Sequence, residues 1–198
     1  MTLVPVTGML RQIRGARKRY DIAKARSVDF TLHSGTKRWN AMTETANDPN
    51  DFIRSHLRMY LETDGAAGHV MDFRHWGGRA DQTTLLLRTL GRRSGKVRIN
   101  PLIYGAMGEG YCVVASNGGA AENPSWYSNL LAQSDVRFQV GRNHFKGNWR
   151  VLAGEERRKM WDLMVNLFPP YGGYQAATER EIPIIKLEPK ELIDSIQQ

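Results

Sequence analysis

Four cations crowd the stretch GRRSGKVRINPLIYG, which spans residues 91–105. They fall within seven residues, around a Ser-Gly turn: Arg92, Arg93, Lys96 and Arg98. Arginine forks match the oxygens of phosphate and carboxylate groups, and the amides of a turn add neutral donors. The stretch therefore predicts an anion-binding hairpin tip; a solvated basic turn is the alternative, since charges collect on turns.

A second stretch, ASNGGAAENPSWYSNLLA over residues 115–132, places two glycines between an apolar strand and the start of a helix. Such a platform lets a flat polar ligand approach backbone donors, because glycine removes the side chain that would keep it away. A plain turn at Gly118 and Gly119 is the alternative. Trp126 and Leu130 lie one helical turn apart, which favours core packing over stacking on a ligand.

A third stretch, FPPYGGYQ over residues 168–175, carries Tyr171 and Tyr174 on stiff prolines and flexible glycines. Exposed tyrosines on such a loop could cover an apolar or aromatic substrate. The alternative is a helix stop whose tyrosines pack back on the core.

Other catalytic chemistries find no support in the motifs. The five histidines form no HExxH motif or close His/Asp cluster, so we expect no metal site. Cys112 lies in an apolar strand pattern and is expected to be a buried, inert thiol. The glycines of GAMGEG do not match the dinucleotide spacing, and no G-x-S-x-G motif occurs.

The elements that must position these stretches begin with a helix. NDPNDFIRSHLRMYLETDG predicts a helix that Asp48 or Asn50 could cap, that has Pro49 in its first turn and that Gly65 ends. Its expected buried stripe consists of Phe52, Ile53, Leu57, Tyr60 and Leu61.

Strands follow from residue 83. Apolar and alternating runs predict strands over 83–90, 97–105 and 111–116, with Pro101 at an edge or bulge. A helix start is predicted with Asn123 as its cap and Pro124 in its first position, and Arg142-Asn143 predicts a hairpin turn. A helix over 154–168, broken by PPYGGY, leads to a short strand near 183–189 and a helical end. Hairpins with helices inserted late indicate a small β-barrel or an α+β sheet.

Length, charge and cysteine content indicate a one-domain protein with a basic N-terminal segment. Its 198 residues fit one domain and carry a net charge of +8. Residues 1–26 hold +6 of that charge, which weakens a nucleic-acid interface as a role for the whole protein. Residues 9–26 predict a basic amphipathic helix, either solvated or docked on anionic lipid, and residues 27–47 a connector. One cysteine, no signal peptide and no apolar span lead us to expect a cytoplasmic protein, with membrane association left open.

The three stretches and TEREIPIIKLEP resemble blocks of the deazaflavin-dependent nitroreductase and quinone reductase family over residues 85–189, and DGAAGH just upstream looks similar too. The resemblance implies a split β-barrel with peripheral helices, of mainly β or α+β class. It divides the chain into an N-terminal helical extension over 1–47 and a deazaflavin-binding barrel over 48–198. It also implies hydride transfer from reduced coenzyme F420 to a quinone, an enone or a nitro compound, without a catalytic triad.

The resemblance also implies site residues. The basic turn would hold the acidic tail of the cofactor through Arg92, Arg93, Ser94, Lys96 and Arg98. The strands and the glycine loop would surround its ring and ribityl chain through Asn100, Pro101, Ala115, Ser116, Asn117, Gly118, Gly119, Trp126 and Asn129. Tyr171 and Tyr174, and more weakly Tyr104, are substrate-pocket candidates.

Two departures from the family pattern leave alternatives open. Many members carry lysine where this chain has Arg93, which keeps the charge, and lysine where it has Asn117, which removes a cation. Neutral Asn117 makes FMN an alternative cofactor in the same fold. A barrel that binds an apolar ligand such as a fatty acid or a haem breakdown product at the membrane surface, without catalysis, is a third hypothesis, and homodimer formation is left open.

Overall fold

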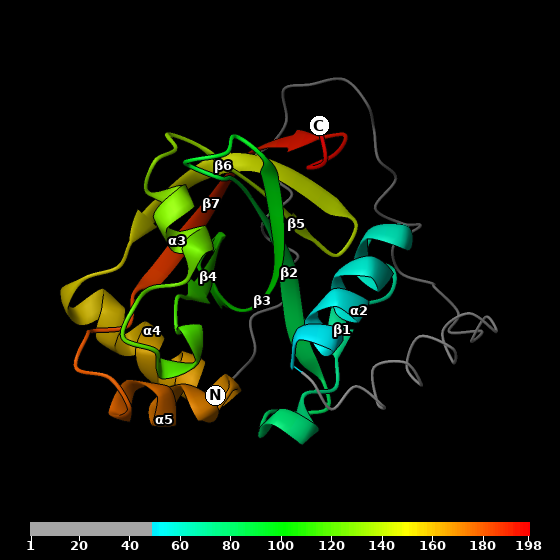
Figure 1. Ribbon diagram of the computed structural model, residues 1–198. Coiled ribbons are helices and arrows are strands. Elements are labelled where there is room, and N and C mark those ends of the chain that lie inside the picture. Colours follow the sequence, from blue (N-terminus) through cyan, green and yellow to red (C-terminus); the bar gives the residue numbers. More distant parts are fainter. Residues whose placement is uncertain (1–48) are drawn as a thin grey trace.

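The computed structural model describes residues 49–198, coloured in Figure 1. The predicted basic helix over 9–26 and the connector over 27–47 lie outside these described residues. Within them, no helix is long and apolar enough to cross a membrane.

The centre of the fold is a closed antiparallel barrel. Six strands follow one another around it in the order β2-β3-β4-β7-β6-β5, and β5 pairs back with β2. Their bounds are β2 Gln82–Leu90, β3 Val97–Met107, β4 Gly110–Val114, β5 Val136–Val140, β6 Asn143–Val151 and β7 Ile184–Ile193. The two-residue strand β1 (Val70–Met71) pairs antiparallel with the first two residues of β2. The predicted small β-barrel is confirmed.

Strand β3 changes neighbours along its length. Residues 97–103 pair with β2, and Tyr104–Met107 pair with β4. The edge of β3 that faces away from β2 therefore carries no strand before Tyr104. Pro101 lies in this single-sided part, so the predicted edge position is confirmed, and the strand can lack one backbone donor there at no cost to a ladder.

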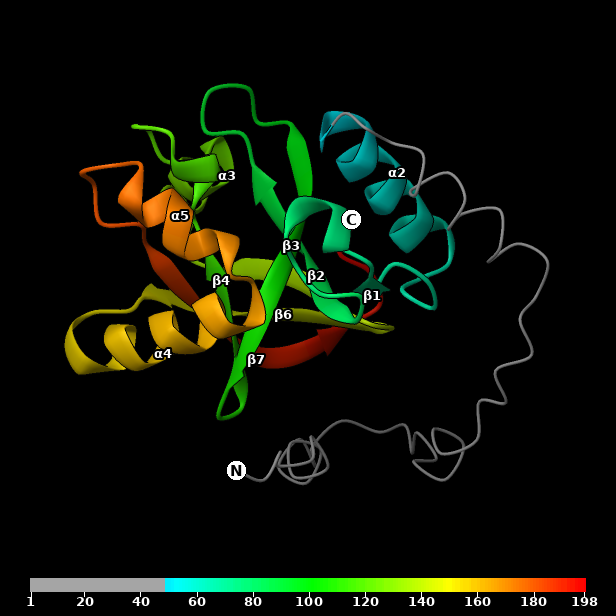
Figure 2. The same cartoon turned by 90° about the horizontal axis from the view of Figure 1, so that it is seen from below.

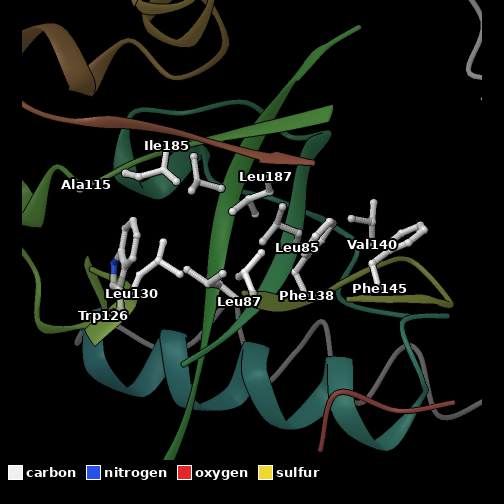
Figure 3. Close-up of a cluster of buried hydrophobic side chains, with 12 residues drawn as sticks. Leu85, Leu87, Ala115, Trp126, Leu130, Phe138, Val140, Phe145, Ile185 and Leu187 are labelled. Atoms are coloured by element: carbon white, nitrogen blue, oxygen red, sulfur yellow. The ribbon is translucent and has the colours of Figure 1, made fainter. Parts of the chain in front are cut away.

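Apolar side chains fill the barrel from strands that lie far apart in the sequence (Figure 3). Leu85 and Leu87 of β2 meet Phe138 of β5, and the helix α3 (Ser125–Leu130) contributes Trp126 and Leu130. Trp126 is 6% exposed and Leu130 is fully buried, so their predicted place in the core is confirmed. Alternate residues such as Leu86 point outward, where helices cover them.

Helices cover two outer faces of the barrel, as Figure 2 shows from below. Helix α4 (Gly154–Leu167) and helix α5 (Pro170–Ala176) bury Ile103 and Cys112 on one side. Helix α2 (Pro49–Glu62) packs Tyr60 on Leu86 on the other. A short turn, η3 (Arg74–Trp76), links α2 and β1 to β2.

The buried stripe of α2 differs from the predicted one. Ile53 is 45% exposed, whereas His56 and Met59 are buried with Phe52 and Tyr60. The other buried residues lie four, seven and eight positions after Phe52, and Ile53 falls outside the stripe that they form. His56 is accepted inside because its Nε2 donates to the Gly68 carbonyl oxygen at 2.8 Å.

Two local predictions were wrong, and a third was incomplete. The N-cap of α3 is Pro124, because the side chain of Asn123 accepts from Arg180 instead of capping the helix. The β5–β6 turn is Gly141-Arg142, since Val140 pairs with Asn143 and Gly141 takes the positive φ of 56°. PPYGGY does break α4, but it then forms helix α5, which its low propensity conceals.

The C-terminal prediction was also wrong. Strand β7 runs over ten residues and pairs with both β4 and β6, and the residues after it are not helical. Its length comes from tertiary pairing on both edges, which the sequence of one strand does not reveal.

Gly65 gives a direct test of packing at the end of α2. It has φ +74°, and an added Cβ would lie 2.0 Å from the Gly141 carbonyl oxygen. We expect Gly65→Ala to lower the free energy of unfolding by ~3 kcal/mol or more in urea titrations. Gly108→Ala is the matched control, because Gly108 has φ +58° with nothing within 4 Å, and it should cost only ~1 kcal/mol. Equal costs would contradict this account.

His56 predicts a pH dependence of stability. Burial lowers its pKa from 6.5 to about 4. The unfolded chain therefore binds a proton below pH 6.5 that the folded chain refuses, so stability is full above that pH and falls as pH falls toward 4. Between pH 7.5 and 5 we expect the folded state to lose ~2 kcal/mol through this group.

His56→Gln is the matched variant, because a glutamine amide can still donate to the Gly68 carbonyl without titrating. Urea titrations at pH 7.5 and pH 5 should show a smaller pH-dependent loss for this variant than for the native chain. The same loss in both proteins would mean that His56 is not the responsible group.

Candidate functional site

The basic stretch forms the loop between β2 and β3. Leu90 pairs with Val97, and the Gly91 amide donates to the Lys96 carbonyl oxygen at 2.8 Å. The amides of Ser94 and Gly95 both donate to the Gly91 carbonyl oxygen, and Gly95 takes φ +65°. The local sequence thus builds a tight loop whose long side chains project outward.

A pocket of about 430 Å³ lies beside this loop. The hairpin supplies one wall and the start of α3 the other. Its lining residues are Gly91, Arg92, Arg93, Ser94, Arg98, Ile99, Asn100, Ser125, Trp126 and Asn129. Half of the fourteen predicted cofactor residues are in this set, brought together from two separate stretches of sequence.

Helix α3 holds the hairpin in place through two amide side chains. The buried Asn129 accepts from the Arg92 amide at 3.1 Å through its Oδ1. Gln133, just after α3, accepts from the Leu90 amide at 3.1 Å and donates to the Asn129 carbonyl at 2.9 Å. The loop is therefore fixed at its base, and its cations are presented on a rigid frame.

The four cations of the loop are exposed, and among residues 49–198 none of them pairs with a carboxylate. Other arginines of the described chain do pair, such as Arg150 with Glu156. Unneutralised cations clustered at a pocket raise the local concentration of anions. The side chains of Asn100 and Asn129 add amide groups, and Trp126 lines the pocket from the core, so the lining suits a polar ligand with an anionic tail.

The glycine loop, residues 115–119, follows β4 directly in the chain. Ser116 has helical φ and ψ, and Asn117, Gly118 and Gly119 follow with φ of 51°, 64° and 83°. Asn117 donates from Nδ2 to the Glu122 carbonyl oxygen at 3.0 Å, so its side chain closes the loop. Gly119 lies against α5, where an added Cβ would come 2.8 Å from the Tyr174 carbonyl oxygen.

Seven predicted cofactor residues do not line the pocket. Ala115 through Gly119 form the glycine loop, which leads through residues 120–124 to α3. Lys96 lies in the hairpin loop, and Pro101 follows Asn100 in β3.

The three candidate tyrosines do not share one surface. Tyr171 is 6% exposed and packs with Phe168 in the cluster under α4 and α5, and Tyr174 is half-buried beside it. Of the two interpretations of this stretch, the exposed tyrosine loop is wrong, and the helix stop whose tyrosines pack back on the core is confirmed. Tyr104 lies on the face of β3 that points into the barrel, and burial there raises its pKa to about 12.

Cys112 is buried, as predicted. Burial raises the pKa of its thiol to about 12, so the thiolate needed for nucleophilic attack does not form at neutral pH. Among the described residues, no three His, Cys, Asp or Glu side chains gather in a way that could hold a metal ion.

Sequence reasoning missed several residues of the site. Gly91, Ile99 and Ser125 line the pocket, Gln133 holds the hairpin, and Arg180 holds the glycine loop. Arg180 lies in the TEREIPIIKLEP block, but no local pattern indicates that its side chain reaches a loop about sixty residues earlier.

The family comparison spans the barrel and the residues that line the pocket. Residues 52–189 match the pattern of the F420H(2)-dependent quinone reductase family. This match covers most of the chain, including the hairpin, the glycine loop and α5. The chain belongs to the F420H(2)-dependent quinone reductase family.

Individual relatives are similar over the same region. The chain is 38% identical over 114 residues to the "Putative F420H(2)-dependent quinone reductase Rv3178" of Mycobacterium tuberculosis, covering 58% of this chain and 96% of the relative. It is 31% identical over 138 residues to the "F420H(2)-dependent quinone reductase Rv1261c" of the same species, covering 68% and 88%. A solved structure described as a domain-swapped dimer is 36% identical, with a TM-score of 0.52, over 71% of this chain and 100% of its own.

Proposed function

We propose that this protein binds reduced coenzyme F420 and catalyses the two-electron reduction of a quinone. The observation that carries this proposal is the set of exposed cations at the pocket beside α3, which pair with no carboxylate in the part of the chain that the structure describes. The family to which the chain belongs is named for the same donor and acceptor. Enones and nitro compounds, which also accept a hydride at an electron-poor centre, are further candidate substrates.

The residues of the site fit such a cofactor. Arg92, Arg93 and Arg98, with Ser94 and nearby Lys96, would hold the phosphodiester and the glutamate carboxylates of its tail. Its ring and ribityl chain would lie against residues that offer amides, backbone or a flat face: Asn100, Pro101, Ala115, Ser116, Asn117, Gly118, Gly119, Trp126 and Asn129.

When bound, reduced F420 supplies the hydride. The protein's own residues bind and orient, so no catalytic triad is required. The hydrogen bond from the Arg92 amide to the Asn129 side chain fixes the loop backbone, and with it the positions from which the cations extend. Tyr174 at α5 is the preferred substrate contact, whereas Tyr171 would have to leave the core and Tyr104 would act from the barrel interior.

FMN is the second candidate cofactor, because Asn117 is neutral and its side-chain amide donates to the Glu122 backbone carbonyl oxygen. Loss of a charged hydrogen bond to phosphate could cost ~1–3 kcal/mol, which is about tenfold to a hundredfold in affinity for the longer, more anionic cofactor. FMN carries one phosphate and needs fewer cations.

We also infer that residues 48–198 act as one cofactor-binding domain in the cytoplasm and that two copies can pair, as the solved relative does. A membrane-bound barrel that takes an apolar ligand without catalysis would depend on residues 1–26. Liposome flotation of the full chain and of a chain lacking those residues tests this alternative. The alternative requires that the full chain floats with liposomes and that the deletion abolishes flotation.

Arg93 and Arg98 provide the test of the cofactor site. Replacing each with alanine should weaken F420 binding about tenfold, since each removes a charged contact worth ~1.5 kcal/mol. The variants should also show a shallower decline of affinity with salt, because fewer cations neutralise the tail. Binding is followed by tryptophan quenching at low and moderate salt, alongside reduction of a soluble quinone.

Arg158→Ala is the control for general loss of positive charge, because Arg158 is exposed on α4 and pairs with Glu155 on the same helix. It should bind F420 as the native chain does. Unchanged affinity and salt dependence in Arg93→Ala and Arg98→Ala would refute the site assignment.

A further inference from the structure

Arg180 directs its whole guanidinium group at the glycine loop. Its Nε donates to the Ala120 carbonyl oxygen at 2.9 Å, and one Nη donates to the Ser116 carbonyl oxygen at 2.6 Å. The other Nη donates to the Asn123 side chain at 2.7 Å, and both lie 3.4 Å from the Ala115 carbonyl oxygen. Every acceptor belongs to residues 115–123, and Arg180 itself precedes β7.

No carboxylate competes for this cation in the described chain. Neighbouring Glu181 pairs with Arg157 of α4 at 2.8 Å. A guanidinium that satisfies its donors with neutral carbonyl oxygens acts as a structural clamp, because charged hydrogen bonds are stronger than neutral ones. The loop also contains one strained residue, because Asn117 is not a glycine and holds a positive φ of 51°.

Peptide geometry then sets what the other side of the loop presents. In a trans peptide, the C=O and the following N–H point in opposite directions. The carbonyls of Ala115 and Ser116 point at Arg180, so the N–H groups of Ser116 and Asn117 point away from it. Ser116 is right-handed and Asn117 left-handed, the alternation that makes successive N–H groups converge on an electronegative atom.

We propose that Arg180 is a positioning residue that locks the Ala115 and Ser116 carbonyls so that the amides of Ser116 and Asn117 face the cofactor as fixed donors. This inference rests on the proposed function, in which the glycine loop surrounds the ring and ribityl chain. Arg180 contributes to affinity through the loop, whereas the hairpin arginines contribute by direct charge.

Three variants of the full-length protein test the proposal. Arg180→Gln should weaken F420 binding about tenfold or more at every salt concentration without changing the salt dependence, because the lost contacts are to carbonyls. Arg180→Lys keeps the charge but cannot reach several acceptors at once. Its affinity for F420 should fall between that of the native protein and that of Arg180→Gln. Arg157→Gln is the matched control, because Arg157 anchors the same segment through the Ile182 carbonyl at 2.9 Å without touching the loop, and it should bind F420 normally.

Amide hydrogen exchange without any cofactor tests the clamp separately. The amides of Gly119 and Ala120 donate within the loop at 3.0 and 3.1 Å, and their exchange should accelerate at least tenfold in Arg180→Gln but not in Arg157→Gln. Unchanged exchange, unchanged F420 affinity, an equal affinity loss in Arg157→Gln or a shallower salt dependence would each overturn the positioning role. Failure of the native chain to bind F420 would refute the proposed function, while the exchange result would still decide whether the clamp exists.

Discussion

The site depends on the point where β3 exchanges one neighbour for another. The strand pairs with β2 up to Ile103 and with β4 from Tyr104 onward. A barrel with β3 and β4 paired along their full length would place a ladder where the pocket now lies. Because the pairing moves across, the first half of β3 keeps one edge without a strand, and Arg98, Ile99 and Asn100 line the pocket from that half.

The other elements stabilise the pocket beside β3 without covering it. Helix α3 seals the end of the barrel with Trp126 and Leu130 and ties the hairpin down through Asn129. Helix α5 and Arg180 hold the glycine loop from two directions. The candidate site is therefore made of exposed cations on a fixed loop, amides and the largely buried Trp126, an arrangement that suits binding and orienting a cofactor that brings its own chemistry.

The strands and the hairpin could be predicted because their signals are local: alternation in β3, turn residues at both ends, and cations within seven residues. Helix α5 could not, because prolines and glycines disfavour a helix and contacts with Phe168 and Gly119 stabilise it. Ile53 was misplaced because the helical period alone does not say which edge of a stripe meets the barrel. Arg180 carries no local signal, since its partners lie in another part of the sequence, and the Ala115–Gly119 positions rested on family resemblance.

The most direct test of the central claim is a parallel titration of the purified protein with oxidised coenzyme F420 and with FMN. Quenching of tryptophan fluorescence would report binding, because Trp126 lines the pocket, and each titration would be run at low and moderate salt. This account predicts tight F420 binding that weakens as salt rises, with FMN binding much weaker. Tighter binding of FMN, or no binding of F420 at low salt, would contradict it.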